Sequence, residues 1–300
     1  MTRHLLDITD LSCPELLEVL DAAVDPAPDP VLEGRGAALL FNKPSARTRH
    51  ATEMAVVALG GHPIYVGPEE VGIDERETAE DVARTMSAYH HLIGARVHEH
   101  AVLDRMALAG SVPVVNLLSD RSHPLQAIAD LLTVRSELGG FQGRTVAWVG
   151  DFSNVARSLA HAAALVGMGI AIASPDGYGP SQADVDEIGA LGAAPVEAGT
   201  DPVAAVTGAH VVVTDAWYSM GQEDEKAERM PIFTPYRVDA ALMSHAADDA
   251  IFLHCLPAHR GDEVTDEVLD GPRSRVWVEA ANRLPAARGA IAWLVSQGSP

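Results

Sequence analysis

The sequence predicts an α/β protein built from two doubly wound domains with mainly parallel sheets. Short apolar runs typical of buried strands alternate with stretches of helical periodicity, and this alternation stops and restarts near the middle of the chain. The length of 300 residues also suits two domains, because a domain commonly holds roughly 100 to 200 residues.

The first half of the chain supplies the first strand–helix series. Ser12 before Pro14 is a typical helix start, and Gly60 with Gly61 ends the helix after the first strand. The expected strands are Ala37–Phe41, Ile64–Val66, Leu92–Val97 and Val112–Asn116, and the expected helices are Pro14–Ala23, Ala46–Leu59, Glu75–Tyr89, Val102–Ala109 and one beginning near Pro124.

The glycine-rich segment Leu138–Gly143 is the expected domain boundary, and a second series follows it. We expect one domain over residues 1–138, a second over residues 139–283, and a return of residues 284–300 to the first. The expected strands are Thr145–Gly150, Ile170–Ser174, Val211–Thr214 and Ile251–Cys255. The expected helices are Ala156–Val166, Ser181–Leu191 and Ala286–Val295, and we expect the last to pack back on the first domain.

Composition excludes several function classes. Asp and Glu number 42 against 21 Lys and Arg, so the formal net charge is −21, which disfavours a nucleic-acid binder or a polybasic membrane anchor. The two cysteines lie far apart in sequence and suit a reducing compartment. With no export signal, and with its longest apolar stretch, Ala162–Ala173, too short to span a bilayer, we expect a soluble, cytoplasmic protein.

The sharpest motif is the segment Phe41–Arg49. A strand ends at Phe41, and Ser45 stands where a helix N-cap belongs, beside Arg47, Thr48 and Arg49. Free amides at a helix N-terminus and guanidinium groups both suit phosphate oxygens, so the motif predicts an anion site. The alternative is a capped surface helix with solvated arginines.

Two further polar positions follow strands of the first half. His123 and Gln126 flank Pro124 at the start of a helix, where an imidazole can donate to a carbonyl oxygen and an amide can bind an amide-like group. Arg96 ends an apolar strand and is either an anion ligand or a snorkelling surface residue. His123 could equally be a simple helix cap.

In the second half, Asp215 follows a strand and begins a loop that runs to Gly221. A carboxylate there can hold an ammonium group, while Ser219 and loop amides can hold a carboxylate, although a turn cap by Asp215 is an equal alternative. His254 and Cys255 also follow a strand. Because neighbours on a strand point to opposite faces, their adjacency argues against a Cys–His dyad, and the spacing does not suit structural zinc.

Two other readings of the sequence are disfavoured. Gly150 precedes a helix where a dinucleotide fingerprint would lie, but Phe152 and Ser153 stand where glycines would let a pyrophosphate approach. A nicotinamide dehydrogenase is therefore not expected. The histidines His90, His91, His98 and His100 lack Cys or Asp at ligand spacing, so we interpret them as solvated residues rather than metal ligands.

Taken in order, these pieces resemble the aspartate/ornithine carbamoyltransferase family, and most closely its ornithine branch, over nearly the whole chain. The matching blocks are Arg3–Asp7, Leu16–Leu20, Ser45–Arg49 with Glu53, Gly60–Pro63, Glu80–Arg84, Val114–Asp120, His123–Gln126, Ala129–Thr133, Gly150–Asp151 with Asn154, Asp215–Glu223, His254–Gly261 and Glu279–Arg283. The Ser-Met-Gly loop and His-Cys-Leu-Pro are the marks of the ornithine branch.

The resemblance implies that the first domain binds carbamoyl phosphate, that the second binds L-ornithine, and that the products are citrulline and phosphate. The implied carbamoyl phosphate residues are Ser45, Ala46, Arg47, Thr48, Arg96, His123, Gln126, Cys255, Leu256 and Arg283. The implied ornithine residues are Asn154, Asp215, Ser219 and Met220. Arg96, His123, Asp215 and Cys255 would be catalytic. No metal and no cofactor are implied, since phosphate is already a good leaving group, and a homotrimer is implied as the assembly.

Three positions depart from the commonest family pattern. Ala46 replaces a frequent Thr, Phe152-Ser153 replaces a frequent Gly-Asn, and the Gln that many relatives carry near Val71-Gly72 has no clear counterpart. Two alternatives to an ornithine enzyme stay open: a sister enzyme acting on another amine, such as putrescine or N-acetylornithine, and a non-catalytic scaffold of the same fold. We also expect Arg47, Arg49, Arg96, His123 and Arg283 to converge in one cleft, a local basic pocket in an acidic protein.

Overall fold

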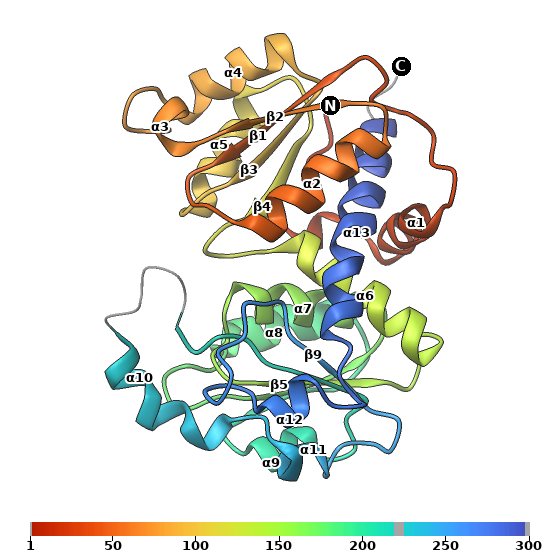
Figure 1. Cartoon of the computed structure of the whole chain (residues 1–300), viewed down its shortest axis with the longest axis vertical. Helices are drawn as coiled ribbons and strands as arrows, with labels where there is room; N and C mark the ends of the chain where they lie inside the picture. Colours follow the sequence, from red (N-terminus) through yellow and green to blue (C-terminus); the bar gives the residue numbers. More distant parts are fainter. Residues whose placement is uncertain (1, 219–224, 298–300) are drawn as a thin grey trace. The chain divides into compact units, whose positions relative to one another are not determined.

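A computed structural model describes residues 2–218 and 225–297 of the chain (Figure 1). The chain divides into two compact units, Met1–Ala129 with Ala281–Pro300, and Asp130–Ala280. The divisions fall inside two helices, α6 (Pro124–Leu138) and α13 (Val276–Ser296). The predicted fold class, two α/β domains with parallel sheets, is confirmed.

The first unit contains a parallel four-stranded sheet in the order β2-β1-β3-β4. Its strands are β1 (Gly36–Phe41), β2 (His62–Val66), β3 (Leu92–Arg96) and β4 (Val114–Leu118), and its other helices are α1 (Cys13–Val24), α2 (Ala46–Ala58), α3 (Pro68–Val71), α4 (Ala79–Tyr89) and α5 (His100–Ala109). β1, β3 and β4 are almost wholly buried, which explains why they read as continuous apolar runs.

The second unit contains a parallel five-stranded sheet in the order β7-β6-β5-β8-β9. Its strands are β5 (Thr145–Val149), β6 (Gly169–Ala173), β7 (Val196–Gly199), β8 (Val211–Val213) and β9 (Ile251–Leu253), and its helices are α7 (Asn154–Leu165), α8 (Gln182–Leu191), α9 (Pro202–Val206), α10 (Lys226–Phe233), α11 (Ala240–Met243) and α12 (Asp266–Leu269). Helices α7 and α8 lie on one face of the sheet, and α9, α11 and α12 lie on the other (Figure 1).

Both sheets reverse their strand order at one point. In the first unit the chain passes from β1 outward to β2 and then back to β3 on the other side of β1; in the second, β6 and β7 lie on one side of β5, and β8 and β9 on the other. The loops that leave two such strands at their carboxyl ends turn to opposite faces and leave a crevice, where ligands bind in open α/β sheets. The ends of β1 and β3, and of β5 and β8, are therefore the places to look for a site.

Several expected boundaries were wrong for identifiable reasons. Helix α4 begins at Ala79 rather than Glu75, because the Thr78 hydroxyl accepts from the Asp81 N–H at 3.2 Å and caps it there. Helix α13 begins at Val276, ten residues before the predicted Ala286, and continues through Pro285. Strand β7 was missed because its residues are largely exposed and give no apolar run.

The end of α13 packs against α1, as expected for the last helix. Trp293 donates its indole N–H to Glu18 at 2.9 Å, and the Arg288 guanidinium donates to the Ala23 carbonyl at 2.6 Å. At Gly289 the two helices approach so closely that a Cβ would lie 2.6 Å from the Val19 carbonyl oxygen. The glycine is therefore required by backbone contact rather than by backbone conformation.

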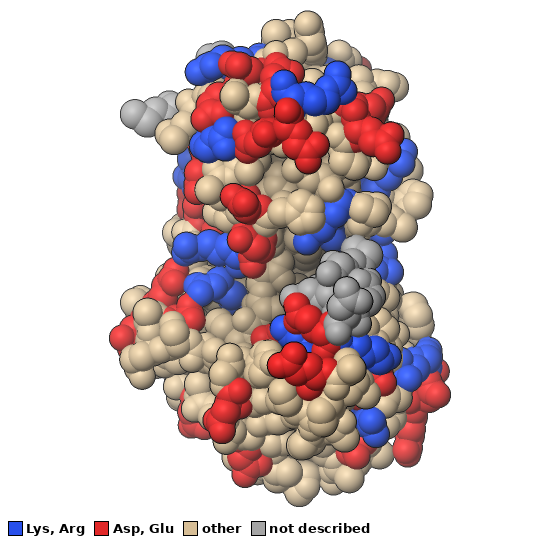
Figure 2. All heavy atoms as spheres, turned by 90° about the vertical axis from the view of Figure 1, so that its left-hand side faces the viewer, with Lys and Arg blue, Asp and Glu red and all other residues tan. Residues whose placement is uncertain are grey.

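On the face drawn in Figure 2, acidic and basic side chains lie beside one another rather than in separate fields. Such mixing is typical of a solvated surface, on which the net charge of −21 acts through solubility and repulsion rather than through one binding patch. Among the described helices, none is both long and apolar enough to cross a membrane.

We predict opposite effects for two glycine-to-alanine substitutions inside helices. Gly289→Ala should lower the free energy of unfolding by about 1 to 3 kcal/mol, since the added methyl meets backbone atoms that cannot move aside. Gly189→Ala in α8 has no atom within 4 Å of its new Cβ, so it should stabilise by about 0.5 to 1 kcal/mol through helix propensity. Urea unfolding followed by circular dichroism checks both, and a destabilised Gly189→Ala would contradict the argument.

Candidate active site

The loop after β1 ends in a capped helix. Ser45 has extended backbone angles, and its Oγ accepts from the Thr48 N–H at 3.4 Å, so it is the N-cap of α2 as the sequence indicates. The Ser45 hydroxyl also donates to Thr48 Oγ1 at 3.2 Å. The loop between β1 and α2 begins beside Arg96, because Phe41 and Arg96 are register partners in neighbouring strands.

Two buried guanidinium groups contact the Thr48 hydroxyl. Arg96 at the end of β3 lies 3.5 Å from Thr48 Oγ1, and Arg283 on α13 donates to the same oxygen at 3.0 Å. Arg283 also donates to the side-chain oxygen of Gln126, which is fully buried. The four side chains therefore form one hydrogen-bonded group inside the first unit, assembled from α2, β3, α6 and α13.

His123 lies in the same electrostatic environment and is only 4% exposed. Burial, together with the charges of Arg283, Arg96 and Lys43, holds the pKa of its imidazole well below the ordinary value of 6.5. Burial and Arg96 likewise lower the pKa of the Lys43 ammonium, against an opposing effect of Asp120. His123 is thus neutral at pH 7, and a neutral imidazole can donate one hydrogen bond without losing a charge.

The two arginines that follow Ser45 differ in their surroundings. Arg47 is exposed in the first turn of α2, and its side chain makes no ion pair or hydrogen bond within the described residues. Arg49 was expected in the same cleft, but its guanidinium pairs with Glu53 at 2.8 Å and stacks 3.8 Å from the centre of the Tyr65 ring. Arg49 is therefore engaged elsewhere, while Arg47 remains available to an anion at the helix N-terminus.

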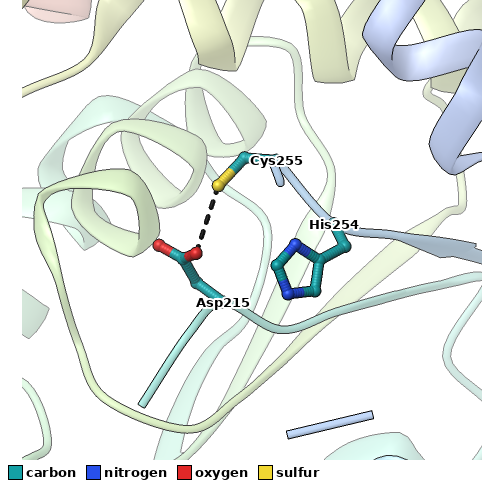
Figure 3. Close-up of side chains that lie close together, drawn as sticks. All are labelled: Asp215, His254 and Cys255. Carbon is teal, nitrogen blue, oxygen red and sulfur yellow. Dashed lines mark hydrogen bonds between the residues drawn. The ribbon is translucent and has the colours of Figure 1, made fainter. Parts of the chain in front are cut away.

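In the second unit, Asp215 and Cys255 meet at the carboxyl ends of β8 and β9 (Figure 3). The Cys255 thiol donates to Asp215 Oδ1 at 3.2 Å. Burial of the thiol, followed by the charges of Asp215 and Glu279, raises the pKa of Cys255 well above its ordinary value. The sulfur is therefore a protonated hydrogen-bond donor at neutral pH, and it lacks the thiolate character that a nucleophilic cysteine needs.

His254 is directed into the protein rather than toward Cys255. Its Nδ1 accepts from the Leu256 backbone N–H at 2.9 Å, its Nε2 bonds Glu263 at 3.1 Å, and the His254 backbone N–H donates to Glu279 at 2.8 Å. The loop is thereby fixed while Leu256 adopts the left-handed angle φ = 60°, which is uncommon for a residue with a side chain. The expectation against a Cys–His dyad agrees with this geometry.

Ligand atoms of Asp215, His254 and Cys255 lie within 4.8 Å of one another, which is close enough to raise the question of a metal ion. Both ring nitrogens of His254 are already hydrogen-bonded, and Cys255 is held in its protonated form. A metal would have to displace these bonds and remove the thiol proton. The group is better explained as a hydrogen-bonded support for the loop after β9.

Asn154 is the first residue of α7, which Ser153 caps by accepting from the Ala156 N–H at 3.5 Å. It follows β5, and Asp215 follows the neighbouring strand β8, so both residues come after the two strands at which the order reverses. The predicted residues Ser219 and Met220 lie outside the described part of the chain.

Sequence reasoning missed some residues that shape these groups. Lys43 lies inside the quoted Phe41–Arg49 motif, and its position beside the arginines was the signal that could have found it. Glu263 and Glu279 are both buried and hold the His254 loop. Glu279 begins the matching block Glu279–Arg283 but was given no role there, and nothing in the local sequence of Glu263 distinguishes it from a solvated acid.

Comparison with known families finds two matching models that together span most of the chain. The model described as "Aspartate/ornithine carbamoyltransferase, carbamoyl-P binding domain" matches residues 3–136. The model described as "Aspartate/ornithine carbamoyltransferase, Asp/Orn binding domain" matches residues 142–294.

Individual proteins are similar over nearly their whole length. The ornithine carbamoyltransferase of Bradyrhizobium diazoefficiens is 48% identical over 298 residues, which covers 97% of this chain and 96% of that protein. Among solved structures, the ornithine carbamoyltransferase from Pyrococcus furiosus matches with a TM-score of 0.94 and 42% identity, covering 99% of this chain and 98% of that one. The enzyme from Thermus thermophilus matches with a TM-score of 0.89 and 40% identity, covering 98% and 99%.

We predict that Asp215→Asn makes Cys255 more reactive toward iodoacetamide at alkaline pH. Removing the neighbouring negative charge lowers the thiol pKa toward its ordinary value, and the thiolate fraction at a fixed pH rises about tenfold for each unit of that fall.

The alkylation rate should be followed against pH by mass spectrometry in a Cys13→Ser background. Asp249→Asn is the control, because Asp249 pairs with Arg144 and does not contact the thiol. An Asp215→Asn profile that coincides with the control would show that the carboxylate does not govern the thiol.

Proposed function

The chain belongs to the aspartate/ornithine carbamoyltransferase family, and we propose that its two groups of polar residues carry out the ornithine branch of this chemistry. The enzyme transfers the carbamoyl group of carbamoyl phosphate to the δ-amine of L-ornithine, giving L-citrulline and phosphate. The observation that carries the residue assignment is the Thr48 hydroxyl held between Arg96 and Arg283, beside a neutral His123.

In this proposal the first unit binds carbamoyl phosphate. The phosphate lies at the N-terminus of α2, held by residues 45–48, of which Ala46 contributes its backbone N–H in place of a hydroxyl. Exposed helix amides and the uncompensated Arg47 suit an anion there. Arg96, His123 and Gln126 hold the carbamoyl group, and Arg283 is a further ligand.

The reaction needs a neutral amine and stabilisation of an oxyanion. The δ-nitrogen attacks the carbamoyl carbon and the carbonyl oxygen gains negative charge. The carbonyl then re-forms as the C–O bond to phosphate breaks, and the proton lost by the amine passes to the departing phosphate. Thr48, Arg96 and His123 donate to the developing oxyanion, and their fixed hydrogen-bonded positions avoid a reorganisation cost during the reaction. A neutral His123 serves as such a donor and need not transfer a proton.

The second unit binds ornithine through Asn154 and Asp215, and the proposal also includes Ser219 and Met220. Asp215 supplies a carboxylate for an ammonium group, and the Cys255 thiol orients that carboxylate by donating to it. Exclusion of water around the bound substrate lowers the pKa of the δ-amine and favours the neutral nucleophile, while the carboxylate of Asp215 is reserved for the α-ammonium group. Cys255 and Leu256 are also proposed to contact the carbamoyl group.

The cellular setting is part of the same proposal. We infer a cytoplasmic enzyme of arginine biosynthesis that works as a homotrimer, without a metal ion or an organic cofactor. The two widely spaced cysteines suit a reducing compartment. Sedimentation of the purified protein tests the trimer directly.

We predict that ornithine is the preferred acceptor in a panel with lysine, putrescine and N-acetylornithine. A free α-amino acid of ornithine length satisfies both Asp215 and the residues assigned to the amino-acid end, whereas putrescine lacks the carboxylate and N-acetylornithine lacks the α-ammonium. Colorimetric ureido detection with carbamoyl phosphate checks this. Carbamoylation of another amine with no citrulline from ornithine would overturn the assignment.

Arg47→Ala should weaken carbamoyl phosphate binding by at least about 100-fold, since it removes charge-assisted hydrogen bonds of about 1.5 to 3 kcal/mol each. Isothermal titration calorimetry with carbamoyl phosphate measures the change. Arg84→Ala is the control, because Arg84 is an exposed arginine of the first unit paired with Asp81. Equal affinity of the two variants would reject the assigned phosphate site.

A further inference from the structure

One ion pair at the crevice of the second unit has no part in the reaction described above. Asp151 follows β5 directly after Gly150, and Arg229 lies on α10. The Arg229 guanidinium donates to Asp151 Oδ2 at 2.8 Å, to the Trp217 carbonyl at 2.9 Å, and to Glu225 Oε2 at 2.8 Å. One side chain thus joins three separate points of the chain.

The pair is held in an aromatic surrounding. The Arg229 side chain is 13% exposed, and its guanidinium lies 5.1 Å from the centre of the Tyr178 ring and 5.8 Å from that of Phe233. Stacking on aromatic rings and a planar fork of donors favour arginine over lysine at such a position. The side chain is therefore fixed in place, unlike a solvated surface arginine.

The points that Arg229 joins are the two loops assigned to ornithine. Asp151 begins the segment that leads to Asn154, and Trp217 lies two residues after Asp215. Tyr178 supports the first of these loops as well, since its carbonyl accepts from the Phe152 N–H at 2.9 Å. Because β5 and β8 are the strands at which the order reverses, Arg229 bridges the two sides of the crevice.

The crevice of the second unit also holds two neighbouring carboxylates, those of Asp151 and Asp215. Burial raises the pKa of the Asp151 carboxyl, the Asp215 charge raises it further, and Arg229 acts in the opposite direction. Asp215 has no cationic partner within the described residues. Arg229 therefore neutralises one of two neighbouring carboxylates and leaves the other to a cationic ligand.

We propose that Arg229, paired with Asp151, is a positioning residue for the amino-acid substrate. It fixes the spacing between the Asn154 and Asp215 loops and makes Asp215 the carboxylate that meets the substrate's ammonium group. This role rests on the proposed function, since it presumes that these loops bind ornithine. Arg229 itself does not touch the reacting atoms.

Arg229→Gln tests the proposal with two readouts. L-norvaline has the α-amino acid head of ornithine but no δ-amine, so its calorimetric titration in the presence of carbamoyl phosphate reports binding without reaction. We expect its Kd, and the KM for ornithine, to rise at least tenfold, with the KM for carbamoyl phosphate unchanged within twofold. Arg229→Lys should give an intermediate loss, because lysine restores the charge but not the three simultaneous bonds.

The double variant Arg229→Gln with Asp151→Asn tests the pairing. If the two residues act through each other, the double variant loses no more norvaline affinity than Arg229→Gln alone. Additive losses would overturn the pairing. Unchanged norvaline binding in a folded Arg229→Gln protein would overturn the positioning role, as would an equal loss for both substrates accompanied by a lower Tm.

Arg144→Gln is the matched control. Arg144 pairs with Asp249 in the same unit but directly precedes β5, at the opposite end of that strand, so both substrates should bind as in the parent.

Measurements on the parent protein separate the proposed function from the role of Arg229. If it binds norvaline but forms no citrulline, the proposed function fails and the norvaline titrations still decide the role of Arg229. If it forms citrulline but binds no norvaline, the proposed function stands and the KM for ornithine decides the role of Arg229.

Discussion

The reversal of strand order in each sheet is the constraint on which the rest of the structure depends. A parallel sheet collects the carboxyl ends of its strands at one edge, and a reversal leaves a crevice between two outgoing loops. In the first unit this brings Thr48 and Arg96 together across 48 residues of sequence. In the second it places the Asp151 and Asp215 loops side by side, so one topological feature creates both candidate sites.

The two crevices carry opposite electrostatic character, although the chain as a whole is strongly acidic. Lys43, Arg96 and Arg283 act together on His123 in the first unit, and Asp151 and Asp215 influence each other in the second. Under the proposed function, an anionic substrate and the ammonium group of an amino acid would each meet a complementary charge. The net charge of −21 did not predict this difference between the two crevices, because a sum over the whole chain does not show where a few charged groups lie.

Features that depend only on neighbouring residues could be predicted from the sequence. The Ser45 cap and the apolar runs of β1, β3 and β5 each depend on neighbouring residues, and they gave the fold class correctly. The contact of Arg283 with Thr48 joins residues 235 positions apart, and only the family resemblance assigned Arg283 to the same ligand. The Asp151–Arg229 pair was missed because each residue alone looks like a solvated charge, and the residues lie 78 positions apart.

The clustered cations of the first unit explain why His123 stays neutral. Bringing Arg96, Arg283 and Lys43 together is unfavourable, because like charges repel and burial removes their hydration. Hydrogen bonds to Thr48 and Gln126 offset part of this cost, and His123 avoids adding to it by staying neutral. Under the proposed function, the positive charge of this group favours a bound phosphate, and its donors lie in fixed positions for the transition state.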